Sequence, residues 1–540
     1  MADQMNLDRC ELKYYVPVGP PRIPVVVVWH HCSIVRFVTL NQSFTIVMSQ
    51  IPIVKGTIVQ EQPAPPQYGQ YGRSGNDSQY NQSGYVQQQQ DPYGVNASDM
   101  FGSSDTSFNG VKGTPQAKGF KDVIFAIAFI IHLVVMMVVM AGFTVSAQNG
   151  YNYKGVVYCV STCALVALGL STMALGFMMN FATELVKIAL FFSVGCSLAV
   201  GILGALSSQM LMCIVGFASF LLGCCYAYFV WPRIPFAAAN LRTGLAGVRS
   251  NLGLTIVAYV FLALAFAWTV WWSIAAGAAM SSIGGTVLFL FFLSFYWTHE
   301  VLKNTVHVTV AGVIGTWWFA PEEASSFCSG AIMDSFVRAT TYSFGSICFG
   351  SLLVAIVQAL RALHRHAHEN DDCSFVICIV DCILGCIEGI IEYLNKWAYV
   401  YVGLYGYSYL DGGRNVMTLF QNKGWSTIIA DDLADNVLFM VSVAIGLFTG
   451  LVGLIIATLD KNIFAGVGYD DNVGGIGFIV GFLVGYLFAS ITMSVVASAV
   501  NTVIVCFAEA PAEFEQNHPL LSQEMRGAWV RAWPEFSFNA

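Results

Sequence analysis

The sequence predicts an all-α membrane protein, a polytopic bundle of about ten transmembrane helices. Two observations lead to this prediction. Hydrophobic residues make up 56% of the 540 residues and charged residues only 10%, which is too few charges to cover the core of a soluble protein. Apolar segments also recur along the chain at roughly the 20-residue length that spans a bilayer. We therefore expect the lipid bilayer to surround most of the chain.

Residues 1–119 are expected to form a disordered, low-complexity cytoplasmic tail. From Gln60 to Gly119 the sequence is rich in Gln, Tyr, Gly, Ser and Asn and has almost no aliphatic residues to bury. Such a segment cannot offset the conformational entropy that ordering would cost. A transmembrane domain is expected over 120–510, and a cytoplasmic C-terminal tail over 511–540.

Ten spans follow from hydropathy and from the charges that flank each apolar segment. The sixth and seventh are separated only by a polar stretch from His299 to His307, which one long broken helix would also explain. We expect two spans, because this choice places His364, Arg365 and His366 on the same side as the N-terminus. The expected spans are 122–147, 156–179, 184–207, 209–231, 252–279, 282–300, 304–320, 335–363, 432–459 and 475–508.

The distribution of Lys and Arg over the loops predicts the orientation, because basic residues in short loops favour the cytoplasmic side. With the N-terminus inside, most loop Lys and Arg fall on the cytoplasmic side. The opposite side receives Lys154 and Lys461 beside two acidic loops, 321–334 and 460–471. We therefore expect both termini to be cytoplasmic.

A cytoplasmic amphipathic segment is expected over about 374–420, between the eighth and ninth spans. Asp381, Glu388 and Glu392 fall seven and four residues apart and so share one face of a helix. The opposite face is apolar and contains Ile387, Ile390, Ile391 and Leu394. This pattern predicts a helix that lies on the membrane surface with its polar face in water.

The cysteines and glycines leave alternatives open. The fifteen cysteines lie mostly in apolar runs, where they behave as small hydrophobes and predict no disulfide framework. Cys378, Cys382 and Cys386 recur every four residues, and helix packing, palmitoylation and metal binding would each explain that spacing. Glycines three and four residues apart in the last two spans predict either tight helix packing or a helix that moves.

The motif content excludes several function classes. The sequence has no GxxxxGK[ST], HExxH or GxSxG motif and no His, Cys and Glu set at metal-ligand spacing, so we expect no enzyme and no cofactor. It also has no Lys/Arg-rich run that would neutralise phosphates, which excludes nucleic acid as a partner. Glu184 and Lys187 lie one helical turn apart and are expected to pair with each other.

Four stretches carry a resemblance to a known family. They are TVHVTVAGVIGTWWF at 305–319, FGSICFGSLLVAIVQALRAL at 344–363, CIEGIIEYLNKWAYVYVGLYG at 386–406 and SVVASAVNTVIVCFAEAPAEFEQNHPLLSQEM at 494–525. They resemble the choline transporter-like family, and within it the fungal branch called pH-nine-sensitive protein, over roughly 121–533. The resemblance implies about ten spans, cytoplasmic termini, a surface-lying segment after the eighth span, and transport.

The loop between the first two spans favours the fungal branch. It comprises only Gln148 to Gly155, whereas animal members of the family carry a large extracellular domain there. Choline is the substrate of the animal relatives, and the family name does not extend that substrate to the fungal branch.

A site for a small organic cation of this type would use aromatic faces within about 6 Å of the positive charge, together with a carboxylate. Trp268 and Trp272 lie deep in the fifth span and are expected to face a pore. Ionisable groups at membrane depth usually face a cavity or a partner, so the polar break around Glu300 is a second candidate. For the tryptophans near span ends, an aromatic belt at the lipid interface is the alternative. The candidate residues are Trp268, Trp272, Glu300, Asn304, His307, Trp317, Trp318 and Tyr342.

The sequence thus predicts a plasma-membrane transporter that moves a small organic cation such as choline. One alternative is a non-transporting membrane scaffold or stress-sensing protein, which would bind partners through its tail and surface helix. Another is a channel-like or lipid-handling protein, which would show flux without saturation. Neither a coupling ion nor an oligomeric state follows from the sequence.

Overall fold

The computed structural model confirms the all-α class. Every regular element of the described chain is a helix, and seven helices of that part are long and apolar enough to cross a membrane. Most of the expected N-terminal tail, up to residue 115, lies outside the described residues. These are 116–146, 154–279, 285–367, 375–422, 433–460, 462–464 and 473–534.

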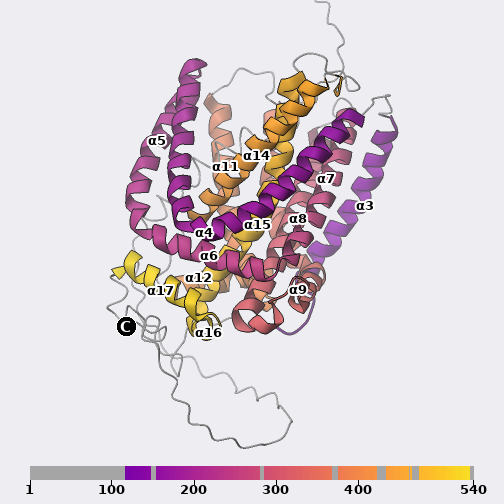
Figure 1. Cartoon of the computed structure of the whole chain (residues 1–540). Coiled ribbons are helices and arrows are strands. Elements are labelled where there is room, and N and C mark those ends of the chain that lie inside the picture. The colour runs from indigo at the N-terminus through magenta and orange to yellow at the C-terminus, as the bar shows by residue number, and fades with distance from the viewer. Residues whose placement is uncertain are drawn as a thin grey trace, which may run out of the picture.

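The long helices run between two ends of one bundle, and shorter helices cover one of these ends, which we call the lower end (Figure 1). The long helices are α3 (Val123–Ser146), α4 (Lys154–Leu206), α5 (Met210–Val230), α7 (Gly253–Ala279), α8 (Gly285–Phe319), α10 (Phe344–Ala367), α11 (Phe375–Tyr405), α14 (Leu433–Leu459) and α15 (Val473–Glu509). The shorter ones are α6 (Ile234–Ser250), α9 (Gly330–Thr340), α12 (Tyr409–Asn422), α16 (Pro511–Asn517) and α17 (Pro519–Ala532).

Helix α4 makes two passes through the bundle. Its 53 residues correspond to about 80 Å at the rise of an α-helix, more than twice the roughly 30 Å hydrocarbon core of a bilayer. The backbone leaves helical geometry at Phe181, with φ −122° and ψ 26°, and the chain turns sharply there (Figure 1). The two halves correspond to the second and third expected spans.

The sixth and seventh expected spans form a single helix, so the prediction of two crossings there was wrong. Helix α8 runs from Gly285 to Phe319 as one α-helix. The polar residues that suggested a break are accommodated inside the bundle, where Glu300 and Asn304 are buried among other helices. Polar groups at membrane depth are tolerated when the protein itself supplies their partners.

Helix α11 supplies the pass that the merging of those two spans removes. Trp397 and Tyr401, in its second half, have no exposed surface, and Glu388 on its polar face is only 1% exposed. The large exposed side chains of this stretch are apolar: Ile383, Ile387, Ile390 and Leu394. The expected surface-lying segment was therefore wrong over α11, because the polar face meets other helices and the apolar face is turned outward.

The first correction removes one predicted pass and the second adds one, so the number of passes is unchanged. The loops between α8 and α11, however, lie at the opposite end of the bundle from the one we expected. The described chain still passes ten times between the two ends, through α3, both halves of α4, α5, α7, α8, α10, α11, α14 and α15. Asp122, next to the first residue of α3, bonds to Ser346 at the start of α10. Helix α10 therefore starts at the lower end, and His364, Arg365 and His366 lie at the upper end, not on the side of the N-terminal segment as we expected.

Helices α14 and α15 form a tight pair through their glycines. A Cβ atom on Gly453 would collide with the backbone of Gly477, and one on Gly477 would collide with Gly453 and Ala457. Small residues of this kind let membrane helices approach closely. The tight packing that the glycine spacing predicted is therefore present.

The C-terminal helices α16 and α17 close the lower end. The side chain of Asn517 donates to the carbonyl oxygens of Trp318 at 2.8 Å and Phe319 at 3.1 Å. These bonds satisfy carbonyls that the last turn of α8 leaves without helical partners. Phe514 and Trp529 are buried, so 511–534 belong to the packed body.

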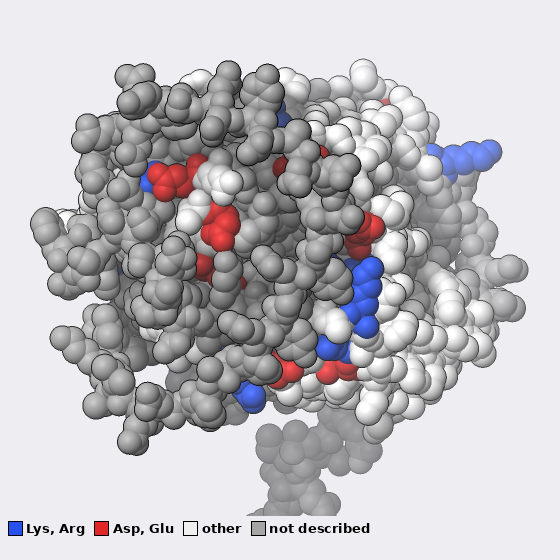
Figure 2. All heavy atoms as spheres, turned by 90° about the horizontal axis from the view of Figure 1, so that it is seen from below, with Lys and Arg blue, Asp and Glu red and all other residues white. Residues whose placement is uncertain are grey.

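The surface of the lower end differs from that of the flanks. Figure 2, which looks onto the lower end, shows Lys, Arg, Asp and Glu side chains on it, whereas the flank visible at the right is almost entirely uncharged. Large apolar side chains are exposed along α3, α4, α5 and α7. This division is typical of a bundle whose sides face lipid and whose ends face water.

Candidate functional site

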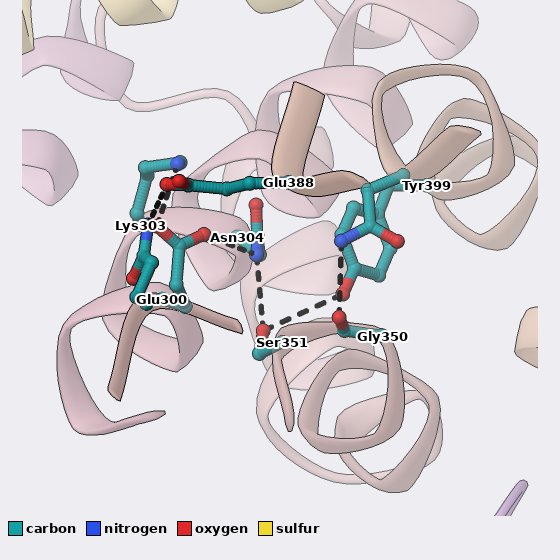
Figure 3. A network of polar contacts seen from close by, with 9 residues as sticks. Glu300, Lys303, Asn304, Gly350, Ser351, Glu388 and Tyr399 are labelled. Carbon is teal, nitrogen blue, oxygen red and sulfur yellow. Dashed lines mark hydrogen bonds and ion pairs between the residues drawn. The ribbon is translucent and has the colours of Figure 1, made fainter. Parts of the chain in front are cut away.

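Three of the predicted residues come together on one side of α8. Glu300, Asn304 and His307 follow one another at helical spacing. Polar side chains of α10 and α11 lie around the first two (Figure 3). All of these lie well inside the bundle, away from its ends. The contacts of these three helices therefore define the candidate site.

Asn304 is the centre of the contacts. Its amide nitrogen donates to Ser351 Oγ of α10 at 3.0 Å and lies 3.4 Å from Glu300 Oε2. The hydroxyl oxygens of Ser351 and Tyr399 are 3.4 Å apart, and Tyr399 donates to the carbonyl of Ile347 at 3.1 Å. Ser351 and Tyr399 have no exposed surface. Because buried polar groups are costly without partners, these bonds hold α8, α10 and α11 in register.

Two carboxylates approach each other next to Asn304. Glu300 pairs with Lys303 Nζ at 2.9 Å. Glu388 of α11 accepts from Gln358 Nε2 at 2.9 Å and from Arg361 Nη1 at 3.3 Å, both on α10. Figure 3 shows the side chain of Glu388 reaching from α11 toward Lys303 and Glu300. Acidic groups from two helices thus converge, and each is paired with a basic side chain.

Ion pairs continue toward the upper end of the bundle. Arg365 Nε lies 3.0 Å from Asp381 Oδ2, and Arg361 Nε lies 3.7 Å from Asp381 Oδ1. Arg361 thereby contacts both acidic groups, Asp381 and Glu388. These pairs join the end of α10 to the beginning of α11.

Hydrogen bonds without a basic partner continue toward the lower end. Asn395 of α11 donates to the carbonyl of Gly350 at 3.0 Å and accepts from the hydroxyl of Tyr409. Asp122 accepts from Ser346 Oγ at 2.6 Å and from the backbone N–H of Tyr409 at 2.9 Å. A Cβ atom on Gly350 would collide with the side chains of Tyr399 and Tyr409. Only a glycine therefore leaves room for these two tyrosines.

Together these side chains form a series that follows α8, α10 and α11 from one end of the bundle to the other. We call this series the polar track. It is marked, from the upper to the lower end, by Asp381, Arg361, Glu388, Glu300, Asn304 and Tyr399.

His307 lies beside the polar track and connects it to other helices. Its Nδ1 is 2.7 Å from Ser498 Oγ of α15, and its Nε2 is 3.1 Å from the carbonyl of Lys396. Lys396 in turn pairs with Asp435 of α14 at 3.3 Å. The predicted residue His307 thus joins α8 to α11 and α15.

The predicted Trp268 and Trp272 belong to an aromatic cluster between α7 and α8. Trp272 is 1% exposed and donates its indole N–H to the carbonyl of Phe291 at 3.0 Å. Its ring lies 4.7 Å from that of Phe295, and the ring of Trp268 lies edge-on to Trp271. The ring contacts of Trp272 are therefore those of packing between α7 and α8, whereas the ring contact of Trp268 lies within α7.

The predicted Trp317, Trp318 and Tyr342 lie at the lower end, outside the polar track. Trp317 stacks on His518 with ring centroids 3.9 Å apart, and Trp318 stacks on Phe514 at 4.0 Å. Both tryptophans are buried, so the alternative of a lipid-facing belt was wrong for them. The ring centroids of Tyr342 and Phe120 are 5.2 Å apart.

Sequence reasoning missed the site residues on α10 and α11. Glu388 was recognised only as part of a polar face, which we assigned to water. A signal for the site does exist, because polar residues recur at seven-residue steps within otherwise apolar helices. The steps are Ser351, Gln358 and Arg365 on α10, and Asp381, Glu388 and Asn395 on α11.

Comparison with known proteins gives one family and several relatives. A family model described as plasma-membrane choline transporter matches residues 214–512, more than half of the chain. Protein pns1 of Aspergillus fumigatus is 29% identical over 257 residues, which is 43% of this chain and 48% of the relative. Protein PNS1 of Debaryomyces hansenii is 34% identical over 191 residues, 34% of this chain and 35% of the relative.

A relative outside the fungi matches similarly. A CTL-like protein of Dictyostelium discoideum is 29% identical over 251 residues, which is 43% of this chain and 44% of the relative. The matches thus span about half the length of these relatives or less. The three site helices, α8, α10 and α11, lie within the stretch that the family model matches, as does α15, which His307 contacts.

Proposed function

Because the chain belongs to the plasma-membrane choline transporter family and is a multi-pass membrane protein of the transporter class, we propose that it carries a small organic cation, such as choline, across the plasma membrane. The observation that carries this proposal is the polar track along α8, α10 and α11. A solute with a positive charge would cross the bundle along that series of side chains.

The free-energy cost of burying the polar side chains of the track supports a role in transport. Buried ion pairs are often no more stabilising than well-packed apolar residues of similar volume. Polar and ionisable groups inside a membrane are expensive, and they commonly mark the path of a substrate or ion. A function that needs these groups therefore explains the track better than helix cohesion does.

The charges at mid-track support a cationic substrate. Glu300 and Glu388 come from different helices, point toward one another (Figure 3) and are both buried. Attraction between a carboxylate and a cation is stronger in such a low-dielectric setting than in water. The rings of Tyr399 and Tyr409 lie next to the same stretch, 5.8 Å apart, and aromatic faces attract quaternary ammonium groups.

The lower end is proposed to face the cytoplasm, with both termini on that side. The backbone N–H of Gln116, the first described residue, donates to the carbonyl of Tyr405, and the Tyr405 hydroxyl donates to Glu509 at the end of α15. The start of the described chain therefore lies at the same end of the bundle as the C-terminal helices that follow α15 (Figure 1). The short helices α6 and α17 of this end carry Arg233, Arg242, Arg249, Arg526 and Arg531 beside or within them. Basic residues near span ends favour the cytoplasmic side.

Uptake of labelled choline into proteoliposomes that contain the purified full chain tests the proposal. Saturable uptake that unlabelled choline suppresses, and that ethanolamine or betaine suppresses less, is the expected result. Flux without saturation would favour the channel-like alternative instead. Absence of uptake by folded protein, in the presence of a working control transporter, would remove choline and favour the scaffold alternative.

A further inference from the structure

Lys303 differs from the other basic side chains of the polar track in its exposure. Its ammonium lies 2.9 Å from Glu300, yet 55% of the lysine side chain is exposed, whereas the Glu300 side chain is only 9% exposed. Arg361 and Arg365, which hold the other acidic groups, expose 13% and 29%. Lys303 therefore has the fewest packing contacts to lose if it leaves its partner.

We propose that Lys303 is a built-in competitor for the cationic substrate. The Lys303 ammonium pairs with the Glu300 carboxylate, which is the group that the substrate cation would bind. When an organic cation binds, the lysine side chain swings aside into the exposed space, and its return displaces the cation and allows release. This inference rests on the proposed function and concerns the regulation of the same site.

The neighbours of Glu300 fit such an exchange. The amide of Asn304 lies 3.4 Å from Oε2, whereas Lys303 is on Oε1. Asn304 is itself fixed by Ser351, so the carboxylate keeps its orientation when the lysine departs. Glu388 reaches toward the same place from α11 (Figure 3). A cation that replaced the Lys303 ammonium would therefore bind Glu300, while Glu388, which is paired with Arg361, points toward it from α11.

The chemistry explains why a competitor is useful here. A buried carboxylate without a cation is strongly destabilising, and Lys303 removes that cost whenever no substrate is present. A lysine ammonium is a compact charge on a flexible stem with rotatable bonds, so it can leave and return without movement of the backbone. The same carboxylate can thus bind a cation without retaining it.

Helix α4 contains a matched control for this pair. Glu184 and Lys187 have the same three-residue spacing and a separation of 3.0 Å, but Glu184 is 62% exposed. Removal of Lys187 therefore changes the same kind of ion pair, on a helix outside the polar track, without uncovering a buried carboxylate. Lys187→Met should leave choline binding unchanged.

The test measures equilibrium binding of labelled choline to the purified full chain and its uptake into proteoliposomes. Lys303→Met should tighten binding about tenfold, equivalent to about 1.4 kcal/mol, and should lower the maximal uptake rate because release becomes slow. Lys303→Arg should weaken binding about fivefold, because a guanidinium holds a carboxylate through two bonds. In a Glu300→Gln background, Lys303→Met should change both quantities much less, since the carboxylate for which lysine and substrate compete has been removed.

If Lys303 is a competitor, choline binding should become tighter in Lys303→Met and weaker in Lys303→Arg. If Lys303 has only a structural role, both substitutions should change choline binding in the same direction. Unchanged or weaker binding by folded Lys303→Met would overturn the proposal. If that variant does not fold, as judged by size-exclusion chromatography, equal or tighter binding by Lys303→Arg would overturn it. Absence of choline binding by the wild-type protein overturns the proposed substrate as well, whereas normal wild-type binding with unchanged Lys303 variants overturns the competitor alone.

Discussion

Two helix interfaces of this bundle are held together in different ways. Between α14 and α15, the contact consists of glycines whose missing side chains let the backbones meet, as at Gly453 and Gly477. Between α8, α10 and α11, the contact consists of hydrogen bonds and ion pairs around Asn304 and Glu388. Close approach also occurs here, since a Cβ on Gly403 of α11 would lie 2.7 Å from Ala311 of α8.

This difference indicates that the first interface serves helix packing and that the second also provides functional side chains. The α14–α15 pair illustrates that van der Waals packing of small residues suffices to join helices in a membrane. The polar interface has close packing as well, so its hydrogen bonds and ion pairs fix the register of the helices and are not the only contacts that join them. Substitutions should consequently affect folding at the first interface and transport at the second.

The largest effect is expected from Gly481→Leu on α15. A Cβ at this position would collide with the backbone carbonyl of Thr449, so the two helices must separate. We expect a loss of about 3 kcal/mol in stability, seen as loss of the monodisperse peak in size-exclusion chromatography. Gly195→Leu on α4 is the control, since nothing lies within 4 Å of its Cβ position. Equal behaviour of the two variants would contradict the role assigned to the glycines.

The next effect is expected from Glu300→Gln on α8. The change keeps the shape of the side chain but removes a charge that the proposed substrate needs, so choline uptake should fall about 100-fold, an amount equal to about 2.7 kcal/mol. Stability should change little, because the Lys303 side chain is 55% exposed and is not held in a buried position by Glu300. Melting temperature and uptake are measured on the same preparation, with Glu184→Gln as the control. Normal uptake by Glu300→Gln would remove this carboxylate from the site.

A smaller effect is expected from Asn304→Leu. Leucine fills the volume but cannot bond to Ser351 or Glu300, so Glu300 is less well positioned, and we expect about a tenfold rise in the KM for choline. The melting temperature should fall only modestly, because a typical net hydrogen bond contributes about 1 kcal/mol. Thr172→Val, which removes a hydroxyl bonded within α4, serves as the control. A collapse in stability without a specific rise in KM would make Asn304 a structural residue only.

The smallest effect concerns a third interface, where α8 meets the C-terminal helices. Burial lowers the pKa of His518 below its usual value of 6.5, although its bond to the Trp317 carbonyl opposes the shift. The folded state thus favours the neutral form of His518. Its contribution to the free energy of unfolding is therefore fully present above pH 6.5 and decreases as the pH falls below 6.5. The change should not exceed about 0.5 kcal/mol, because His518 is only partly buried and solvent screens it.

Melting temperatures of the wild type and His518→Gln between pH 5 and pH 7 measure this effect. Their difference should shrink as the pH falls, because only the wild type has this imidazole to protonate. A difference that is constant across the pH range would show that His518 does not titrate in this interface.

The fold class was predictable from the sequence, but two spans were not. The number of passes was right, whereas the division at His299 to His307 and the surface position of α11 were wrong for the same reason. Both assignments placed polar residues in water. A hydropathy scale treats Glu300 and Glu388 as unfavourable in a membrane, because it takes no account of their partners. Except for Lys303, those partners lie on other helices and reach the two carboxylates only when the helices pack together. The sequence alone does not distinguish a charged residue that has a partner inside the bundle from a charged residue that has none.

The candidate site was predictable only in part, again because of partners distant in sequence. Glu300, Asn304 and His307 could be selected because polar residues at helical spacing in an apolar segment are conspicuous. The tryptophans could not be assigned in the same way, because a ring near the end of a span faces lipid or protein depending on what covers it. For Trp318 the covering ring is Phe514, which lies beyond the last span.

The inward polar face of α11 has a consequence for the biogenesis of the protein. On its own this helix would bring Asp381, Glu388 and Lys396 into the membrane, which is unfavourable for insertion. Arg361 and Arg365 of α10 neutralise the first two of these charges, and α10 is synthesised immediately before α11. We therefore expect the two helices to enter the bilayer as a hairpin, with α8 already present to receive it. The order of synthesis thus supplies partners for these two acidic groups before α11 has to cross.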